Sequence, residues 1–142
     1  GIVYRTAMGL ARRHGRLKSK QISVAGHDVA YLEGGSGPPL ILLHGFGANK
    51  DHWTLIAPFL TRHYRLIVPD LPGFGDSSRR DSANYATAPQ LERIGAFADA
   101  LGVDTFHLGG NSMGGYLAAM FAARNSSRVQ SRPKPMLQRI DI

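Results

Sequence analysis

Apolar residues follow two different patterns that alternate along this chain. Runs of consecutive apolar residues lie at 40–43 and within 65–68, and a further short strand-like segment lies at 105–108. Stretches with apolar residues at helical spacing follow at 53–60, 91–101 and 116–121. Continuous runs are typical of strands buried on both faces of a parallel sheet. The alternation of strand and helix predicts an α/β fold with a mostly parallel sheet, flanking helices and right-handed crossovers.

Two short segments with strand-like alternation, 21–24 and 29–32, precede this pattern. The four residues between them include Gly26 and Asp28, so we predict a β-hairpin here. Further along, Asp51 is expected to cap the helix that follows the first apolar run, and Pro58 is expected to bend that helix.

The first 17 residues form a separate segment that is both amphipathic and basic. At 100° per residue, one face of a helix over residues 2–14 is apolar and the opposite face carries arginine. The apolar face holds Val3, Tyr4, Ala7, Met8, Leu10 and Ala11, and the arginines are Arg5, Arg12 and Arg13. Two interpretations stay open, namely packing of this helix on the domain and peripheral contact with an anionic membrane surface.

Composition and charge exclude several classes of function. The 142 residues contain no cysteine, which excludes a disulfide framework, a thiolate zinc site and a cysteine nucleophile. The net charge of +7 comes from the two ends, because residues 1–20 hold six basic and no acidic side chains and residues 124–142 hold five basic and one acidic. The body between them is slightly acidic, so we expect no nucleic-acid partner. No signal peptide is visible in these residues, which leaves a cytoplasmic and a membrane-associated location open.

Three of the predicted strands end in glycine-rich loops, where open α/β sheets place their functional groups. The loops after 40–43 and 65–68 lack the third glycine of a dinucleotide-binding motif, and the chain contains no phosphate-binding loop motif. We therefore expect no nucleotide, no other cofactor and no metal ion. Residues 110–114, Gly-Asn-Ser-Met-Gly, match the G-x-S-x-G motif between an apolar strand and a helix.

The G-x-S-x-G match predicts a nucleophile elbow with Ser112 as the catalytic nucleophile. In such a turn a strained backbone conformation projects the serine hydroxyl out of the turn. Gly110 and Gly114 are the small neighbours that the turn requires, and Asn111 completes the motif between them. The helix after Ser112 points its positive N-terminal end at a developing oxyanion. A glycine-rich turn with an idle serine is the alternative interpretation.

The loop of residues 44–47 supplies the second part of the predicted site. Acyl transfer needs two hydrogen-bond donors placed for the tetrahedral oxyanion. We expect these donors to be the backbone N–H groups of Met113 and Phe46. Gly45 and Gly47 allow the loop to come close, and His44 is expected to hold the loop by a hydrogen bond.

Four motifs resemble the α/β-hydrolase superfamily in sequence, order and spacing. They are LLHGFG at 42–47, NKDHW at 49–53, PDLPGFGDS at 69–77 and GGNSMGG at 109–115. From about residue 20 to residue 129, the chain is similar to bacterial lipases and esterases of the monoacylglycerol-lipase type. The resemblance implies an α/β-hydrolase fold and, as substrates, carboxylic esters with an apolar acyl chain.

The same resemblance implies roles for individual residues. Ser112 would be the nucleophile, Phe46 and Met113 the oxyanion-hole donors, and Asp70 a structural residue. Hydrolases of carbon–carbon bonds share the GNSMGG elbow, so they are the alternative enzyme.

The chain departs from the family pattern after the elbow. In this fold an acidic residue and then a histidine follow the nucleophile. Here the last histidine is His107, and Asp141 is the only acidic residue after Ser112. His107 precedes Ser112 by five residues and lies out of reach along a strand. The resemblance therefore covers an N-terminal half at 18–125, truncated after the elbow helix, and a divergent basic tail at 126–142.

The departure from the family pattern after Ser112 affects both the expected activity and the expected pairing of the sheet. Without a base for Ser112, we expect these 142 residues alone to be inactive. A non-catalytic fragment and an inactive interaction module are therefore alternatives to a hydrolase. The tail contains two prolines between 131 and 136 and no apolar run, so we expect the strand at 105–108 to keep an unpaired outer edge.

Overall fold

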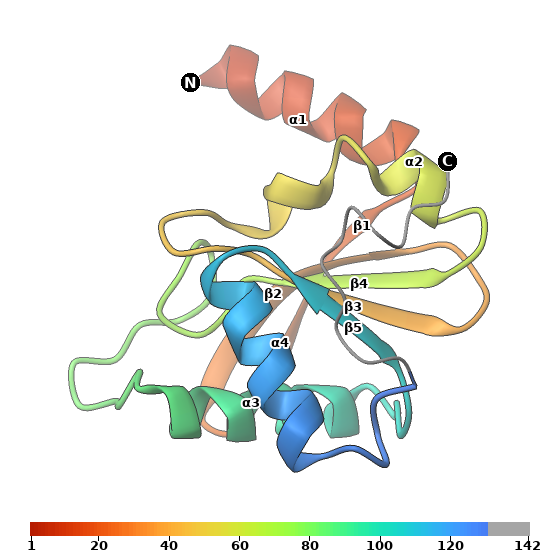
Figure 1. The fold of residues 1–142 in the computed structure, drawn as a ribbon. Coiled ribbons are helices and arrows are strands. Elements are labelled where there is room, and N and C mark those ends of the chain that lie inside the picture. Colours follow the sequence, from red (N-terminus) through yellow and green to blue (C-terminus); the bar gives the residue numbers. More distant parts are fainter. Residues whose placement is uncertain (131–142) are drawn as a thin grey trace.

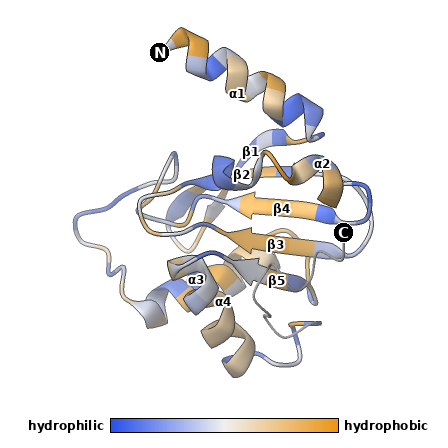
Figure 2. Cartoon of the chain, turned by 45° about the horizontal axis from the view of Figure 1, so that its top comes forward, coloured by the Kyte–Doolittle hydropathy of each residue, from blue (hydrophilic) through white to orange (hydrophobic). Residues whose placement is uncertain are grey.

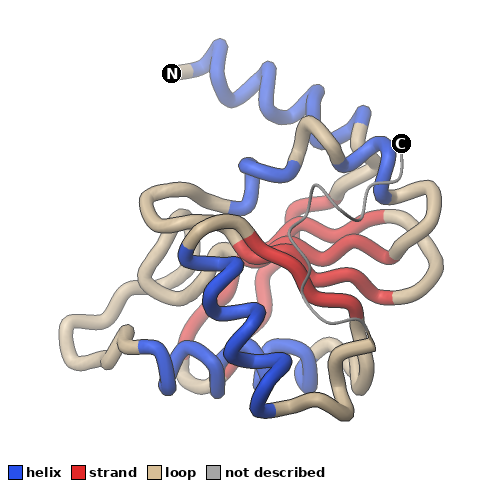
Figure 3. Tube along the Cα trace, in the orientation of Figure 1, coloured by secondary structure: helices blue, strands red, loops and turns tan. Residues whose placement is uncertain are grey.

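Five strands form one mixed β-sheet in the computed structural model, which describes residues 1–130 (Figures 1 and 3). The strands are β1 (Lys18–Val24), β2 (His27–Gly34), β3 (Pro39–Leu43), β4 (Arg65–Pro69) and β5 (His107–Gly110). The helices are α1 (Ile2–His14), the 3-10 helix η1 (Lys50–Trp53), α2 (Ala57–Leu60), α3 (Thr87–Ala100) and α4 (Met113–Arg124). The predicted α/β alternation is confirmed.

The sheet order β1-β2-β4-β3-β5 separates an antiparallel part from a parallel part. β3 pairs in parallel with both β4 and β5. β2 pairs antiparallel with β1 and with β4, so the predicted N-terminal hairpin extends the sheet beyond the parallel strands. Its turn consists of Ala25 and Gly26, whose φ angles are 49° and 77°. Two-residue turns with positive φ match the twist of paired strands, so His27 and Asp28, expected in the turn, belong to β2 instead.

Helices cover both faces of the sheet, and this explains the continuous apolar runs. Along β3, Ile41 and Leu43 face the layer that contains α3 and α4. Leu42 packs with Trp53 on the opposite face. Because successive side chains of a strand point to opposite faces, a strand covered on both sides needs an apolar residue at every position. Figure 2 shows this as orange along β3 and β4.

The helix expected around residues 53–60 is broken into η1 and α2, and its predicted cap is wrong. Asn49 is the N-cap of η1, and its side-chain oxygen accepts a hydrogen bond of 2.9 Å from the backbone N–H of Asp51. The Asp51 carboxylate binds Arg12 of α1 instead. Pro58 bends no continuous helix, because it lies in the first turn of α2, where its missing N–H costs no hydrogen bond.

The strand expected at 105–108 begins two residues later, and its predicted free edge is partly covered. Phe106 forms an isolated parallel bridge with Val129. The N–H of Phe106 donates to the carbonyl of Arg128 at 2.9 Å, and the N–H of Gln130 donates to the carbonyl of Phe106 at 3.0 Å. The first residues of the predicted tail therefore pair with the domain. Residues 131–142 lie outside the described residues.

Helix α1 forms over the predicted residues but buries none of them. It contacts the domain at its C-terminal end, where the Thr61 hydroxyl donates to the carbonyl of Gly15 at 3.1 Å (Figure 1). The Arg12 guanidinium also forms a bidentate ion pair with the Asp51 carboxylate, with N–O distances of 2.7 and 2.8 Å. Among residues 1–130, no helix is both long enough and apolar enough to cross a bilayer.

Candidate active site

Ser112 lies at the junction of β5 and α4, and its backbone is strained. Its φ and ψ angles are 54° and −116°, a conformation that residues with a side chain rarely adopt. Ser112 is exposed, and α4 begins with the next residue, Met113. A strained, exposed serine before a helix is the local geometry that the G-x-S-x-G motif predicts.

Two glycines allow α4 to begin directly against the end of β3. A Cβ on Gly114 would overlap the carbonyl of Leu43 and would lie 2.6 Å from the carbonyl oxygen of His44. A Cβ on Gly110 would overlap the backbone of Gly114. The elbow therefore depends on the absence of side chains at both positions, in addition to the strain at Ser112.

The loop after β3 lies against this elbow. A Cβ on Gly45 would be 3.3 Å from the carbonyl oxygen of Asn111 and 3.4 Å from the Cβ of Ser112. The N–H of Asn111 also donates to the carbonyl of Leu43 at 3.1 Å. The structure thus brings together the two loops that the sequence analysis assigned to one site. Gly47 has a φ of 75°, and a Cβ added there would meet no atom within 4 Å.

The two expected oxyanion donors, Phe46 and Met113, flank this contact. Within residues 1–130, the backbone N–H of neither residue donates to another backbone group. Met113 is the first residue of α4, and the first N–H groups of a helix have no partner inside the helix. Phe46 is 81% exposed, and its ring meets that of Phe74 edge to face with centroids 5.8 Å apart. Among residues 1–130, neither N–H group is thus occupied by a backbone carbonyl.

His44 is fully buried and uses both ring nitrogens to hold the loop. Nε2 accepts a hydrogen bond of 3.0 Å from the N–H of Leu71, so the ring proton is on Nδ1, which donates to the carbonyl of Gly45 at 2.8 Å. Burial lowers the pKa of His44, so the ring is neutral at pH 7. A histidine with both nitrogens engaged is not a free base for Ser112.

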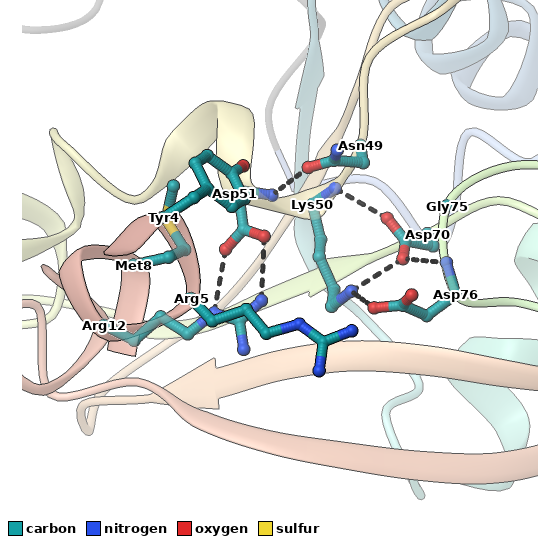
Figure 4. Close-up of a pocket in the computed structure, with 10 residues that line it drawn as sticks. All are labelled: Tyr4, Arg5, Met8, Arg12, Asn49, Lys50, Asp51, Asp70, Gly75 and Asp76. Atoms are coloured by element: carbon teal, nitrogen blue, oxygen red, sulfur yellow. Dashed lines mark hydrogen bonds and ion pairs between the residues drawn. The ribbon is translucent and has the colours of Figure 1, made fainter. Parts of the chain in front are cut away.

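An ion cluster of the buried Lys50 and Asp70 with the exposed Asp76 joins the neighbouring loops (Figure 4). Nζ of Lys50 lies 2.8 Å from Asp70 and 2.7 Å from Asp76, although the Lys50 side chain is only 2% exposed. Backbone N–H groups add to this, because Lys50 N and Asp76 N donate to the Asp70 carboxylate at 2.6 and 2.8 Å. The cluster joins the chain after the 44–47 loop to the loop after β4, which places Asp70 in a structural position.

The charges of this cluster stabilise one another. Burial alone would lower the pKa of Lys50, but its hydrogen bonds to the two carboxylates outweigh burial and raise it. The hydrogen bond from Lys50 lowers the pKa of Asp76. The sequence analysis missed Lys50, because a lysine in a loop is normally exposed and no periodic pattern marks this position.

A cavity of about 450 Å³ lies beside the cluster, between α1 and the domain. Figure 4 shows Tyr4, Met8 and Arg12 of α1 on one side and Lys50 and Asp76 on the other. None of its lining residues belongs to the elbow or to the 44–47 loop. It is therefore a separate feature from the candidate active site.

Among residues 1–130, no hydrogen bond joins the Ser112 hydroxyl to a histidine or to a carboxylate, the side chains that would complete a catalytic triad. His107 begins β5, and its ring contacts that of Tyr64 with centroids 5.6 Å apart. In the part of the chain that the structure describes, no group of three or more histidine and carboxylate side chains could hold a metal ion. Among residues 1–130, the structure thus brings together the serine expected as nucleophile and the two residues expected to supply the oxyanion donors.

Comparisons with known proteins support the predicted family. Residues 38–131 match the family model described as alpha/beta hydrolase fold. The chain is 43% identical over 124 residues to Lipase 1 of Psychrobacter immobilis. This match covers 84% of this chain and 39% of that lipase. It is 35% identical over 99 residues to the monoacylglycerol lipase abhd6-A of Xenopus laevis. This match covers 68% of this chain and 29% of that protein.

A solved structure shows the same likeness in three dimensions. The crystal structure of a membrane phospholipase A superposes with a TM-score of 0.90 and 44% sequence identity. The match covers 92% of this chain and 43% of that chain. The chain therefore spans less than half the length of the relatives it matches.

Proposed function

Because this chain belongs to the α/β-hydrolase fold family, we propose that it carries the nucleophile and the oxyanion hole of a serine hydrolase that acts on carboxylic esters. One observation carries the proposal, namely the strained, exposed Ser112 with the free N–H of Met113 beside it and the 44–47 loop against it. The lipases and the monoacylglycerol lipase among the relatives support ester hydrolysis at the level of the family.

In the proposed reaction, Oγ of Ser112 attacks the carbonyl carbon of the ester and transfers its proton to a base. The carbonyl oxygen becomes negatively charged and accepts hydrogen bonds from the N–H groups of Phe46 and Met113. The intermediate then expels the alcohol, which takes the proton, and leaves an acyl ester on Ser112. Water releases the carboxylic acid in the reverse sequence of proton transfers.

Exposed aromatic rings beside the elbow support an apolar acyl chain as part of the substrate. Phe46 is 81% exposed and Tyr116, on the first turns of α4, is 55% exposed. Phe74 packs edge to face against both Phe46 and His44 and so connects this surface to the buried loop. Rings at the mouth of a site bind hydrocarbon without a hydrogen-bond requirement.

Among residues 1–130, no hydrogen bond joins Ser112 to a side chain that could act as its base. Both ring nitrogens of His44 are hydrogen-bonded to backbone groups, and no histidine follows His107 in this sequence. A serine hydroxyl without a base is a weak nucleophile at neutral pH, and loss of the base in another serine hydrolase costs a factor of about a million in turnover. We therefore propose that these 142 residues by themselves hydrolyse esters extremely slowly.

A chimera tests the proposed function. Residues 1–130 replace the matching part of the Psychrobacter Lipase 1, and the rest of that enzyme supplies the segment C-terminal to the elbow helix. We expect the chimera to hydrolyse p-nitrophenyl butyrate, and Ser112→Ala to lower kcat by at least about a thousandfold. Ser126→Ala, a serine exposed beyond the end of α4, is the matched control and should leave the rate unchanged.

Three results would contradict the proposal. A chimera with a normal far-UV spectrum whose ester hydrolysis does not depend on Ser112 would remove the assigned nucleophile. Cleavage of a carbon–carbon bond in a vinylogous diketone, without ester hydrolysis, would favour the alternative enzyme. Rapid, Ser112-dependent hydrolysis by residues 1–142 alone would show that these residues do contain a base.

A further inference from the structure

Helix α1 exposes apolar side chains that nothing in the described domain covers. Val3 is 84% exposed and Leu10 is 61% exposed, and their seven-residue separation puts them on the same side of the helix. Ile2 is 85% exposed at the start of the helix. A surface helix normally turns its apolar side chains toward the core, so this orientation needs another explanation.

The attachment of α1 to the domain explains which side faces outward. Arg12 points toward Asp51, and Tyr4 and Met8 line the cavity beside the Lys50 cluster (Figure 4). At 100° per residue these three residues lie on the side of the helix away from Val3 and Leu10. The single apolar face expected from the sequence is therefore divided between a side toward the domain and an outward side. The side with Val3 and Leu10 is therefore directed away from the domain, in agreement with the high exposure of both side chains.

The first 20 residues, which include this helix, are strongly positive. Residues 1–20 contain six basic side chains and no acidic one. Arg12 pairs with Asp51 and Lys20 pairs with Glu33. The remaining four form no ion pair with any residue between 1 and 130. Arg5 lines the cavity on the domain side, which leaves Arg13, Arg16 and Lys18 for a partner. A partner that neutralises them must carry negative charge.

We propose that α1 lies on an anionic lipid surface, with Val3 and Leu10 in contact with the acyl region and the unpaired cations at the lipid phosphates. A lipid surface offers both chemistries at the depth of one helix, an apolar layer next to a negatively charged one. A nucleic acid would neutralise the cations but would leave Val3 and Leu10 in water. This inference does not depend on Ser112.

Binding of the full 142-residue chain to vesicles tests the proposal. Large unilamellar vesicles of phosphatidylcholine alone are compared with vesicles containing about 30% phosphatidylglycerol, in a sedimentation assay at about 0.1 M and about 0.5 M salt. We expect binding to the anionic vesicles at least about tenfold tighter than to neutral ones, and weaker at the higher salt concentration because charges are then screened.

Two double variants separate the apolar from the ionic contribution. Val3→Ser with Leu10→Ser should weaken binding at least about tenfold without changing the melting temperature, because neither side chain is buried. Arg13→Glu with Arg16→Glu should weaken it at least about twentyfold. The matched charge control is Arg132→Glu with Lys134→Glu in the tail, which should weaken binding by less than about fivefold.

Several outcomes would overturn the proposal. They are equal binding to neutral and anionic vesicles, loss of binding only in the tail variant, self-association through α1 in place of vesicle binding, and salt-dependent binding to duplex DNA without binding to lipid. Ser112→Ala should bind vesicles like the unaltered chain. A failure of the proposed hydrolase function would therefore leave this result intact, and a failure to bind lipid would leave the hydrolase proposal intact.

Discussion

Helices α1 and α4 have nearly the same length, 13 and 12 residues, but they are attached to the domain in opposite ways. α4 buries Gly114, Leu117, Ala118 and Phe121, and its only charged residue is Arg124 at its end. α1 buries none of its residues and ends in Arg12, Arg13 and His14. Packing along its length holds α4 on the domain. In contrast, α1 is held by the Arg12–Asp51 ion pair and by the hydrogen bond between Thr61 and Gly15 at its C-terminal end.

This difference indicates what each helix contributes. α4 places Ser112 and the N–H of Met113, and a site of this kind needs positions held within a fraction of an ångström. Close packing of Gly114 on the end of β3 provides that rigidity. α1 has no such constraint, so its outward side is available for a partner. Substitutions at matched positions of the two helices test this comparison.

Replacement of a glycine by alanine should have the largest and most contrasting effects. Gly114→Ala should destabilise the domain by about 3 kcal/mol or more, because the new Cβ overlaps the carbonyl of Leu43. Gly9→Ala should stabilise α1 by about 1 kcal/mol, since Gly9 lies mid-helix with no atom within 4 Å of a Cβ. Urea denaturation followed by circular dichroism measures both. Equal effects of the two substitutions would contradict the comparison.

Truncation of a leucine in each helix should give a smaller contrast. Leu117 is 3% exposed in α4, and Leu117→Ala should cost about 2–5 kcal/mol through lost burial and a new cavity. Leu10 is 61% exposed in α1, and Leu10→Ala should change stability by less than about 0.5 kcal/mol. The same denaturation experiment applies. A large loss in Leu10→Ala would show that α1 packs on something in the absence of lipid.

Acidification should lower the free energy of unfolding through His44, whose backbone carbonyl lies close to Gly114 of α4. Burial lowers the pKa of His44, so the unfolded chain binds a proton below about pH 6.5 more readily than the folded chain does. The stabilisation from neutral His44 is therefore complete above about pH 6.5 and is lost as the pH falls toward its lower folded pKa.

Urea midpoints between about pH 7.5 and about pH 5.5 measure this loss. We expect His44→Asn to be less stable than the unaltered chain at the upper end of this range and to lose less stability on acidification. His63→Asn, at an exposed position, should follow the unaltered chain at every pH. An identical pH dependence in His44→Asn would show that other groups cause the acid response.

Local pattern was sufficient for several elements because their causes are local. The apolar runs predicted β3 and β4 since a strand covered on both faces has to be apolar at each position. The elbow could be predicted because Gly110 and Gly114 are needed wherever a serine turn meets a helix in this way. The strain at Ser112 follows from the same motif.

Other features could not be predicted, because they depend on residues far apart in the sequence. Lys50 is buried only because Asp70 and Asp76, 20 and 26 positions later, supply two carboxylates. Asp51 does not cap its helix because Arg12, 39 positions earlier, binds its carboxylate. The pairing of Phe106 with residues 128–130 likewise joins segments separated by a whole helix.

The sequence by itself therefore determined the strand and helix order, the strained turn at Ser112 and the basic, amphipathic character of residues 1–17. These follow from periodicity and from backbone sterics over a few neighbouring residues. Only the tertiary structure decided which ions are buried, how β5 is paired, and which side of α1 faces away from the domain. Those outcomes depend on long-range contacts, whose energies exceed local preferences whenever a charge or an apolar side chain must find its partner elsewhere in the chain.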